Sequence, residues 1–142
     1  MKLKIGLVLG LIVLIFAVYG FFKATPGADN QENLPKIEIT PLSFDFGEIE
    51  FGKIVEYAFK VKNTGKEVLE IKRVATSCAC TIAKVNNETL EPGQETELTV
   101  KYDTAAMGDG PHGRNKQERI IYVKSSDPLK PQTEVMIYAN VK

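Results

Sequence analysis

The 142-residue chain has no tryptophan, one histidine and two cysteines, and it has no excess of basic charge. One His and two Cys cannot complete a four-ligand zinc site of the Cys/His type within the chain. The 18 Lys and Arg residues are balanced by 18 Asp and Glu residues, so the basic surface that nucleic-acid binders use to neutralise phosphates is missing. We therefore exclude such a zinc module and expect no nucleic-acid partner.

Charged residues are also missing from residues 5–22, which are apolar almost throughout. Eighteen helical residues at about 1.5 Å each span roughly 27 Å, close to the hydrocarbon core of about 30 Å. A cleavable signal peptide usually has a shorter apolar stretch and small residues at the cut, whereas Pro26 stands at −3 of a cut after Ala28. We therefore predict that residues 1–23 contain one transmembrane helix that anchors the chain, with a cleaved signal segment as the alternative.

Lys2 and Lys4 precede the apolar block, and the positive-inside rule keeps such residues on the cytoplasmic side. The rest of the chain is then exported. Residues 24–35 are rich in Pro, Gly and polar residues, which predicts a flexible tether. The remaining residues, 36–142, are of a length typical of one domain.

Hydrophobicity in residues 36–142 alternates with a period of two, and no stretch shows a convincing helical repeat. About eight short strands with turn signals between them predict an all-β fold. We expect an immunoglobulin-like antiparallel β-sandwich, with a small closed barrel as the alternative. The alternation assigns these residues to the core: Val55, Tyr57, Phe59, Val61, Leu69, Ile71, Leu98, Val100, Ile137 and Ala139.

Two glycines mark expected changes of direction. Asn63-Thr64-Gly65-Lys66 separates two alternating segments and contains residues that tolerate positive φ, which predicts a hairpin turn. Gly47 directly follows Phe46, and we expect it to let the chain turn sharply as that strand changes direction.

A series of motifs stands in order along residues 43–103: Phe44-Asp45-Phe46-Gly47-Glu48-Ile49, Gly52, Phe59-Lys60-Val61-Lys62-Asn63-Thr64-Gly65, Leu69-Glu70-Ile71, Ser77-Cys78-Ala79-Cys80-Thr81 and Pro92-Gly93. Their order and spacing resemble the bacterial domain-of-unknown-function family 1573. The resemblance implies an exported immunoglobulin-like domain, related to the sperm-protein and Hydin-type sandwiches, with no established activity. It also points to a bacterium, so we expect the domain on the periplasmic side of the inner membrane.

The chain departs from this family where Ala79 replaces the usual glycine between the two cysteines. If that glycine adopts a positive φ in the family, the same conformation costs more free energy with an alanine, and the loop geometry of this chain differs from that of the family.

Cys78 and Cys80 are the chemically suggestive pair of the sequence. In an extended chain they lie on the same side, with Cα atoms about 6–7 Å apart, at the upper edge of disulfide geometry. A bridge between them closes a very small ring, and a strained bridge is easily reduced, so one interpretation is a labile redox pair. Another is a Cu(I) site completed by Met107 or His112 from a glycine-rich loop. The third is that the pair only packs or forms a structural disulfide.

We expect the pair at the start of a strand near one end of the sandwich and partly accessible, since chemistry usually lies on loops of a rigid scaffold. His112 is the only imidazole, and nothing in the sequence establishes a nucleophile and an orienting acid beside it. The Lys72-Arg73 block and residues 114–119 are interpreted as solvated surface.

Two functions stay open. We favour a membrane-anchored, non-catalytic interaction module that binds an unidentified protein partner through sheet edges or loops, and we do not expect an enzyme. The alternative is a thiol redox or copper-handling protein that uses Cys78 and Cys80. Copper is the only cofactor that the sequence suggests.

Overall fold

The computed structural model describes residues 33–142. They contain nine strands and no helix, and therefore no helix long and apolar enough to cross a membrane. The predicted span at residues 5–22 and most of the tether at 24–35 lie outside the described residues.

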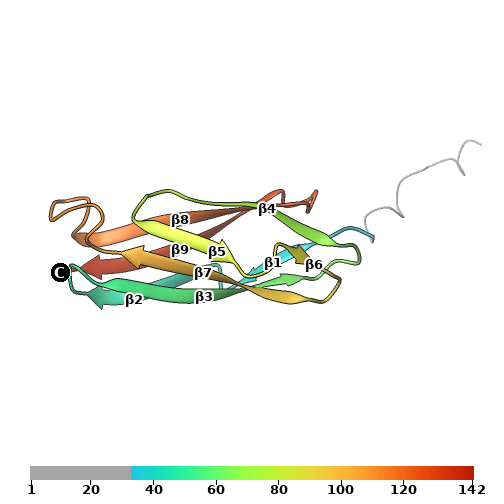
Figure 1. Ribbon diagram of the computed structural model, residues 1–142, viewed down its shortest axis with the longest axis horizontal. Coiled ribbons are helices and arrows are strands. Elements are labelled where there is room, and N and C mark those ends of the chain that lie inside the picture. The colour runs from blue at the N-terminus through green and yellow to red at the C-terminus, as the bar shows by residue number, and fades with distance from the viewer. Residues whose placement is uncertain (1–32) are drawn as a thin grey trace, which may run out of the picture. The chain divides into compact units, whose positions relative to one another are not determined.

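The nine strands form two sheets that make a sandwich (Figure 1). The four-stranded sheet has the order β1-β3-β7-β5, with β1 (Ile37–Thr40), β3 (Ile54–Asn63), β7 (Glu95–Asp103) and β5 (Thr81–Val85). The five-stranded sheet has the order β2-β9-β8-β4-β6, with β2 (Ser43–Ile49), β9 (Gln132–Val141), β8 (Asn115–Ser125), β4 (Leu69–Thr76) and β6 (Thr89–Leu90). The prediction of an all-β sandwich is confirmed.

The pairing is not antiparallel throughout, because β2 runs parallel to β9. The chain leaves β1 at the edge of one sheet and enters β2 at the edge of the other, where it follows the direction of β9. The register of this pair shifts between Asp45 and Glu48, and Gly47 lies in the shift with φ +70°. Gly47 therefore provides a β-bulge within β2, and the expected change of strand direction at this residue was wrong.

The predicted hairpin at residues 63–66 is also wrong. β3 and β4, which flank these residues, lie in different sheets, so the segment crosses from one sheet to the other. Gly65 is needed there for space, and its φ is not in the left-handed region. A Cβ on Gly65 would collide with the carbonyl oxygen of Leu34.

Asn63 holds this crossing in place from a fully buried position. Its Oδ1 accepts the backbone N–H of Gly65 at 2.9 Å. Its Nδ2 donates to the carbonyl of Glu67 at 2.8 Å and to the carbonyl of Leu90 at 2.9 Å. One side chain thus binds the crossing and the short strand β6 together.

The core lies between the two sheets, as the period of two requires. Eight of the ten predicted core residues are buried, and Val55 and Tyr57 are half-buried against the same core. Tyr57 stacks on Phe44 of β2 with ring centroids 3.6 Å apart. This contact closes the sandwich where the two sheets meet along the edge strand β2.

Candidate functional site

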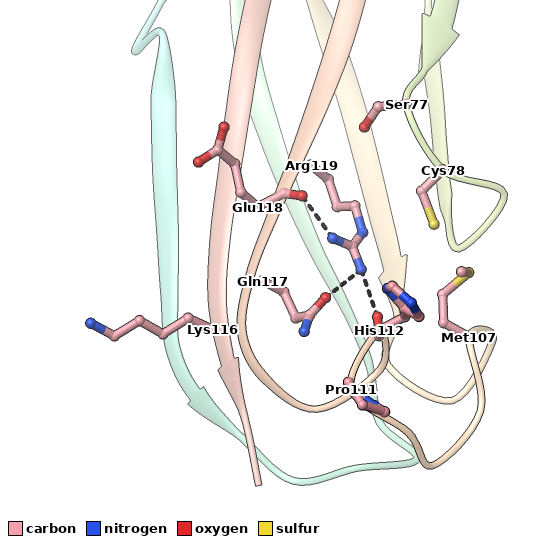
Figure 2. A pocket seen from close by; sticks show the side chains of 9 residues that line it. All are labelled: Ser77, Cys78, Met107, Pro111, His112, Lys116, Gln117, Glu118 and Arg119. Atoms are coloured by element: carbon pink, nitrogen blue, oxygen red, sulfur yellow. Dashed lines mark hydrogen bonds between the residues drawn. The ribbon is translucent and has the colours of Figure 1, made fainter.

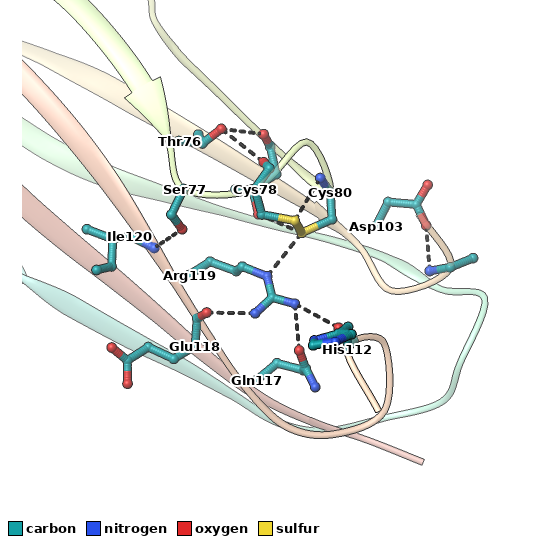
Figure 3. Close-up of a disulfide and its surroundings, with 12 residues drawn as sticks. Thr76, Ser77, Cys78, Cys80, Asp103, His112, Gln117, Glu118, Arg119 and Ile120 are labelled. Carbon is teal, nitrogen blue, oxygen red and sulfur yellow. Dashed lines mark hydrogen bonds between the residues drawn. A yellow bond between two sulfur atoms is a disulfide. The ribbon is translucent and has the colours of Figure 1, made fainter. Parts of the chain in front are cut away.

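Cys78 and Cys80 lie between β4 and β5 and form a disulfide, with Cα atoms 5.2 Å apart (Figure 3). Thr81 begins β5 directly after them. The two cysteines differ in exposure, because Cys78 is half-buried whereas Cys80 is only 2% exposed. Ala79 has no positive φ, so the replacement of the family's glycine introduces no left-handed strain here.

Hydrogen bonds fix the short turn that carries the disulfide (Figure 3). The hydroxyl of Thr76 lies 3.1 Å from the carbonyl of Cys78 and 3.0 Å from that of Thr81. The turn is attached to β8 because Ser77 exchanges two bonds with Ile120, each 2.9 Å long. The disulfide is therefore held on rigid strands.

Arg119 of β8 reaches the disulfide from inside the sandwich end (Figure 3). Its Nε donates to Cys80 Sγ at 3.0 Å. The other guanidinium nitrogens donate to the carbonyl of Glu118 at 2.7 Å, the carbonyl of His112 at 3.2 Å and the side-chain oxygen of Gln117. The guanidinium is therefore held in one position by four acceptors, one of them a cysteine sulfur.

Tyr102 of β7 lies beneath the same guanidinium, whose carbon is 5.6 Å from the ring centroid. Burial raises the pKa of the Tyr102 phenol, and the positive charge of Arg119 opposes this shift. The phenol is therefore neutral at physiological pH and adds no charge beside the guanidinium.

An open pocket of about 410 Å³ lies at this end of the sandwich (Figure 2). It brings Cys78 together with Met107 and His112, the two loop residues that the sequence pointed to. Cys80 does not line it. The lining residues are Ser77, Cys78, Met107, Pro111, His112, Lys116, Gln117, Glu118 and Arg119.

Residues 33–142 hold no group of three or more His, Cys, Asp or Glu side chains that could bind a metal ion. The sulfurs of Cys78 and Cys80 are bonded to each other and are not thiolates. The guanidinium of Arg119 also places a positive charge 3.0 Å from one sulfur, which disfavours a second cation. Copper binding with Met107 or His112 stays a prediction, restricted to the reduced pair.

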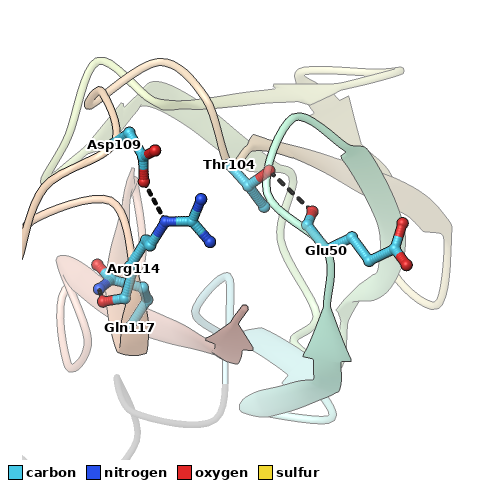
Figure 4. Close-up of polar contacts among 5 residues, drawn as sticks. All are labelled: Glu50, Thr104, Asp109, Arg114 and Gln117. Atoms are coloured by element: carbon cyan, nitrogen blue, oxygen red, sulfur yellow. Dashed lines mark hydrogen bonds and ion pairs between the residues drawn. The ribbon is translucent and has the colours of Figure 1, made fainter.

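The loop between β7 and β8 forms the rim of this pocket and is fixed at both ends (Figure 4). At its start the buried hydroxyl of Thr104 lies 3.4 Å from the carbonyl of Glu50 and 2.9 Å from that of Lys53. Near its end Arg114 pairs with Asp109, and this bond holds the pKa of the Asp109 carboxyl below its usual value. The loop that forms the rim is therefore held by hydrogen bonds at its start and by an ion pair near its end.

A second feature lies on the outer face of the five-stranded sheet. Five side chains there form a continuous apolar and aromatic strip, because paired positions and alternate positions on one strand share a face. Tyr122 is paired with Ala75, and Ile120 is paired with Met136. We call this set the outer strip: Ala75, Ile120, Tyr122, Met136 and Tyr138, all half-buried.

The outer face of the four-stranded sheet is different, because ion pairs join its two central strands, while the exposed side chains of Ile54 and Ile82 lie toward one end. The Glu95 carboxylate forms ion pairs with Lys60 Nζ at 3.0 Å and with Lys62 Nζ at 3.2 Å. The Glu56 carboxylate pairs with Lys101 Nζ at 2.9 Å. The two lysines lower the pKa of Glu95 through hydrogen bonds and charge. The centre of one outer face therefore carries paired charges, whereas the centre of the other is apolar.

Two like charges stand at the edge of the outer strip. Arg73 of β4 and Lys124 of β8 are register partners, and both are exposed. Together with Ala75, Tyr122 and Gln132 they line a hollow of about 300 Å³. Neither cation has an ion-pair partner within residues 33–142. Like charges placed opposite each other repel, so this hollow favours an anionic group.

Sequence reasoning named Met107 and His112 beside the cysteine motif but missed Arg119 and the hollow beside Arg73. Arg73 and Arg119 were interpreted as solvated surface, and nothing in the sequence connects Arg119 with Cys80. A signal for the outer strip was present, since Met136 and Tyr138 occupy the positions of β9 that the alternation assigns to solvent. Contiguous large apolar residues at such positions are typical of protein-binding faces.

Comparison with known proteins agrees with the fold. A protein of unknown function from Porphyromonas gingivalis W83 superimposes with a TM-score of 0.68 and 21% identity, covering 80% of this chain and 50% of that protein. This chain therefore spans half the length of that structure.

Two further solved structures have a similar fold. PapD-like domain 7 of human CEP192 gives a TM-score of 0.57 with 13% identity, over 84% of this chain and 92% of that one. SSP-19, described as an MSP-domain protein like family member in Caenorhabditis elegans, gives a TM-score of 0.50 with 11% identity. The match covers 72% of this chain and 97% of that one. These identities establish the fold alone.

No curated protein matches the chain in sequence. The family described as protein of unknown function (DUF1573) matches residues 37–141, a longer segment than the 43–103 of the sequence motifs. The chain therefore belongs to the DUF1573 family.

Proposed function

We propose that this domain is an exported, membrane-anchored interaction module that binds a protein partner through the outer strip. The observation that carries the proposal is the difference between the two outer faces. Ion pairs join charged side chains of β3 and β7 across the outer face of the four-stranded sheet, whereas Ile120, Tyr122 and Met136 lie half-exposed at the centre of the other sheet. Tyr and Met are enriched in the buried centres of protein interfaces.

The surroundings of the strip indicate the chemistry of the partner. Arg73 and Lys124 repel each other across the strands, and a carboxylate placed between them would relieve this repulsion. Tyr122 lines the same hollow and offers an aromatic surface beside the charges. We therefore expect a protein that presents an apolar patch with an Asp or Glu side chain next to it.

The location of the module is inferred from the chain before the domain. The uncharged residues 5–22, with Lys2 and Lys4 before them, support a single span with the domain on the periplasmic side of a bacterial inner membrane. The partner would then be a periplasmic protein or the exported part of another membrane protein.

The test is capture from native membranes with the full chain as bait. The strip variant combines Tyr122→Glu with Met136→Glu, and the control is Ala58→Glu on the charged outer face, where Ala58 is exposed. A partner retained by the wild type and the control but lost with the strip variant supports the proposal. The purified partner should then bind the Arg73→Glu/Lys124→Glu variant at least about tenfold more weakly, since a lost charge-assisted contact is worth about 1.5–3 kcal/mol.

Two results would overturn the proposal. The first is a partner that the strip variant binds as well as the wild type. The second is a partner that is released by a reducing agent alone, since such a partner is held by a cysteine and not by the outer strip.

A further inference from the structure

We propose that the Cys78–Cys80 disulfide is a centre of thiol–disulfide exchange with a low-molecular-weight thiol. In this exchange the incoming thiolate attacks the sulfur of Cys78, and Cys80 leaves as the thiolate. This role goes beyond partner binding, and it depends on a different part of the domain, the end of the sandwich that carries the cysteine turn.

Exposure selects the sulfur that is attacked. Cys78 is half-buried and lines the open pocket of about 410 Å³, so a small thiol can reach its sulfur from solvent. Cys80 is 2% exposed and does not line the pocket. Exchange requires the nucleophile to approach the sulfur it attacks, and only Cys78 permits this approach.

The surroundings of Cys80 suit a leaving thiolate. Arg119 Nε already lies 3.0 Å from Cys80 Sγ, and the hydroxyl of Thr81 is 3.7 Å from the same sulfur. A disulfide is cleaved faster when the departing sulfur is stabilised as an anion. Because His112 and Gln117 hold the guanidinium in position, it need not reorganise when the negative charge forms.

The reaction balances in two steps. A thiolate RS⁻ bonds to Cys78 Sγ, the bond between the two cysteine sulfurs breaks, and its electron pair goes to Cys80. A second RS⁻ then attacks the R sulfur of the mixed disulfide, which forms RSSR and releases Cys78 as a thiolate. Two thiols are oxidised, and the cysteine pair gains two electrons and takes up the two protons that the thiols lost.

Cysteine variants of the full chain test which sulfur reacts. Cys80→Ser removes the leaving sulfur, so oxidised glutathione should form a stable mixed disulfide at Cys78, which mass spectrometry detects. Cys78→Ser leaves only the buried thiol, and we expect it to react at least about tenfold more slowly under native conditions. Equal rates, or faster reaction of the Cys78→Ser variant, would overturn the assignment.

A second experiment tests Arg119 by the rate at which reduced glutathione opens the native disulfide. Arg119→Gln should slow this step about tenfold, and Arg119→Lys should restore part of the rate. Lys116→Gln is the matched control, because it removes a positive charge from the same pocket but bonds neither sulfur. An equal loss in the Arg119→Gln and Lys116→Gln variants, or no loss in the former, would overturn the role of Arg119. If Arg119→Gln does not fold, the cysteine variants decide alone.

Discussion

The side chain of Arg119 connects Cys80 with the loop before β8, since its Nε lies 3.0 Å from the Cys80 sulfur while another nitrogen donates to the His112 carbonyl. The next residue on the strand, Ile120, points to the opposite face and belongs to the outer strip. Strand β8 therefore contributes to both candidate sites, one inside the end of the sandwich and one on its outer face. The two sites can be altered separately because they lie on opposite sides of this strand.

Substitutions at two adjacent residues of β3 should have very different effects on the free energy of unfolding, because only one of the two lies in the core. Phe59 is fully buried and Lys60 is exposed, so Phe59→Ala should lower the free energy of unfolding by about 3–5 kcal/mol. Lys60→Ala should lower it by less than about 1 kcal/mol, because surface ion pairs contribute little. Urea titration of the full chain measures both values. Equal losses would show that the register of β3 is wrong.

The outer strip should matter little for stability. Tyr122 and Met136 are half-buried and have no sheet packed over them within the described domain, so truncation to Ala should cost about 1 kcal/mol or less each. The same urea titration compares them with Phe59→Ala. A loss of the size seen for Phe59→Ala would mean that these side chains serve the fold and not a partner.

Asn63 should be among the most sensitive polar residues of the domain. Its buried amide accepts from the backbone N–H groups of Gly65 at 2.9 Å and Lys36 at 3.4 Å and donates to two carbonyls, so Asn63→Ala leaves several buried groups without partners. We expect a loss of roughly 2–4 kcal/mol in the free energy of unfolding. Asn87→Ala is the control, because the bond that its side chain accepts from Thr89 is exposed. An equally small loss in the free energy of unfolding for Asn63→Ala and Asn87→Ala would contradict the role of Asn63 in holding the crossing.

The Asp109–Arg114 pair predicts an acid-sensitive pocket rim. Arg114 lowers the pKa of Asp109, and a group whose pKa is lowered by folding contributes stability above its unfolded pKa and loses it as pH falls through the folded one. The contact should therefore persist at neutral pH and disappear only below the usual aspartate value of about 3.9.

Asp109→Asn imitates the acid form at neutral pH. Hydrogen exchange of the amides in residues 105–113 should be faster in this variant than in the wild type, because the loop loses a bond across it. Glu118→Gln removes an exposed carboxylate that lines the pocket and should leave the exchange of these amides unchanged. Equally faster amide exchange in the Asp109→Asn and Glu118→Gln variants would contradict the role of the Asp109–Arg114 pair in holding the loop.

The core could be predicted from the sequence because a half-buried strand must alternate, and residues such as Phe59 and Leu98 follow that rule locally. Strand pairing could not be predicted in the same way. The crossing at Asn63 has the composition of a hairpin turn, but its conformation is set by contacts with Leu90, 27 residues away. The parallel alignment of β2 likewise depends on β9, which begins more than 80 residues later.

The candidate site was predictable in part for the same reason. The spacing of Cys78 and Cys80 indicates a possible bridge by itself, since both lie on one short segment. Arg119 is 39 residues from Cys80, and only the packing of β8 against the turn brings them together. Met136 and Tyr138 were visible as apolar residues at solvent positions, but only the register with Ile120 shows that they form one strip.

Site-specific photocrosslinking in native membranes tests the central claim, that the outer strip contacts a protein partner. A photoreactive phenylalanine replaces Tyr122 in the full chain, and in a second chain it replaces Thr99, on the four-stranded sheet. We predict a crosslinked product of one discrete mass from position 122, weakened when Arg73→Glu and Lys124→Glu are added, and no such product from position 99. Products of equal yield from both positions, or none from position 122, would contradict the account.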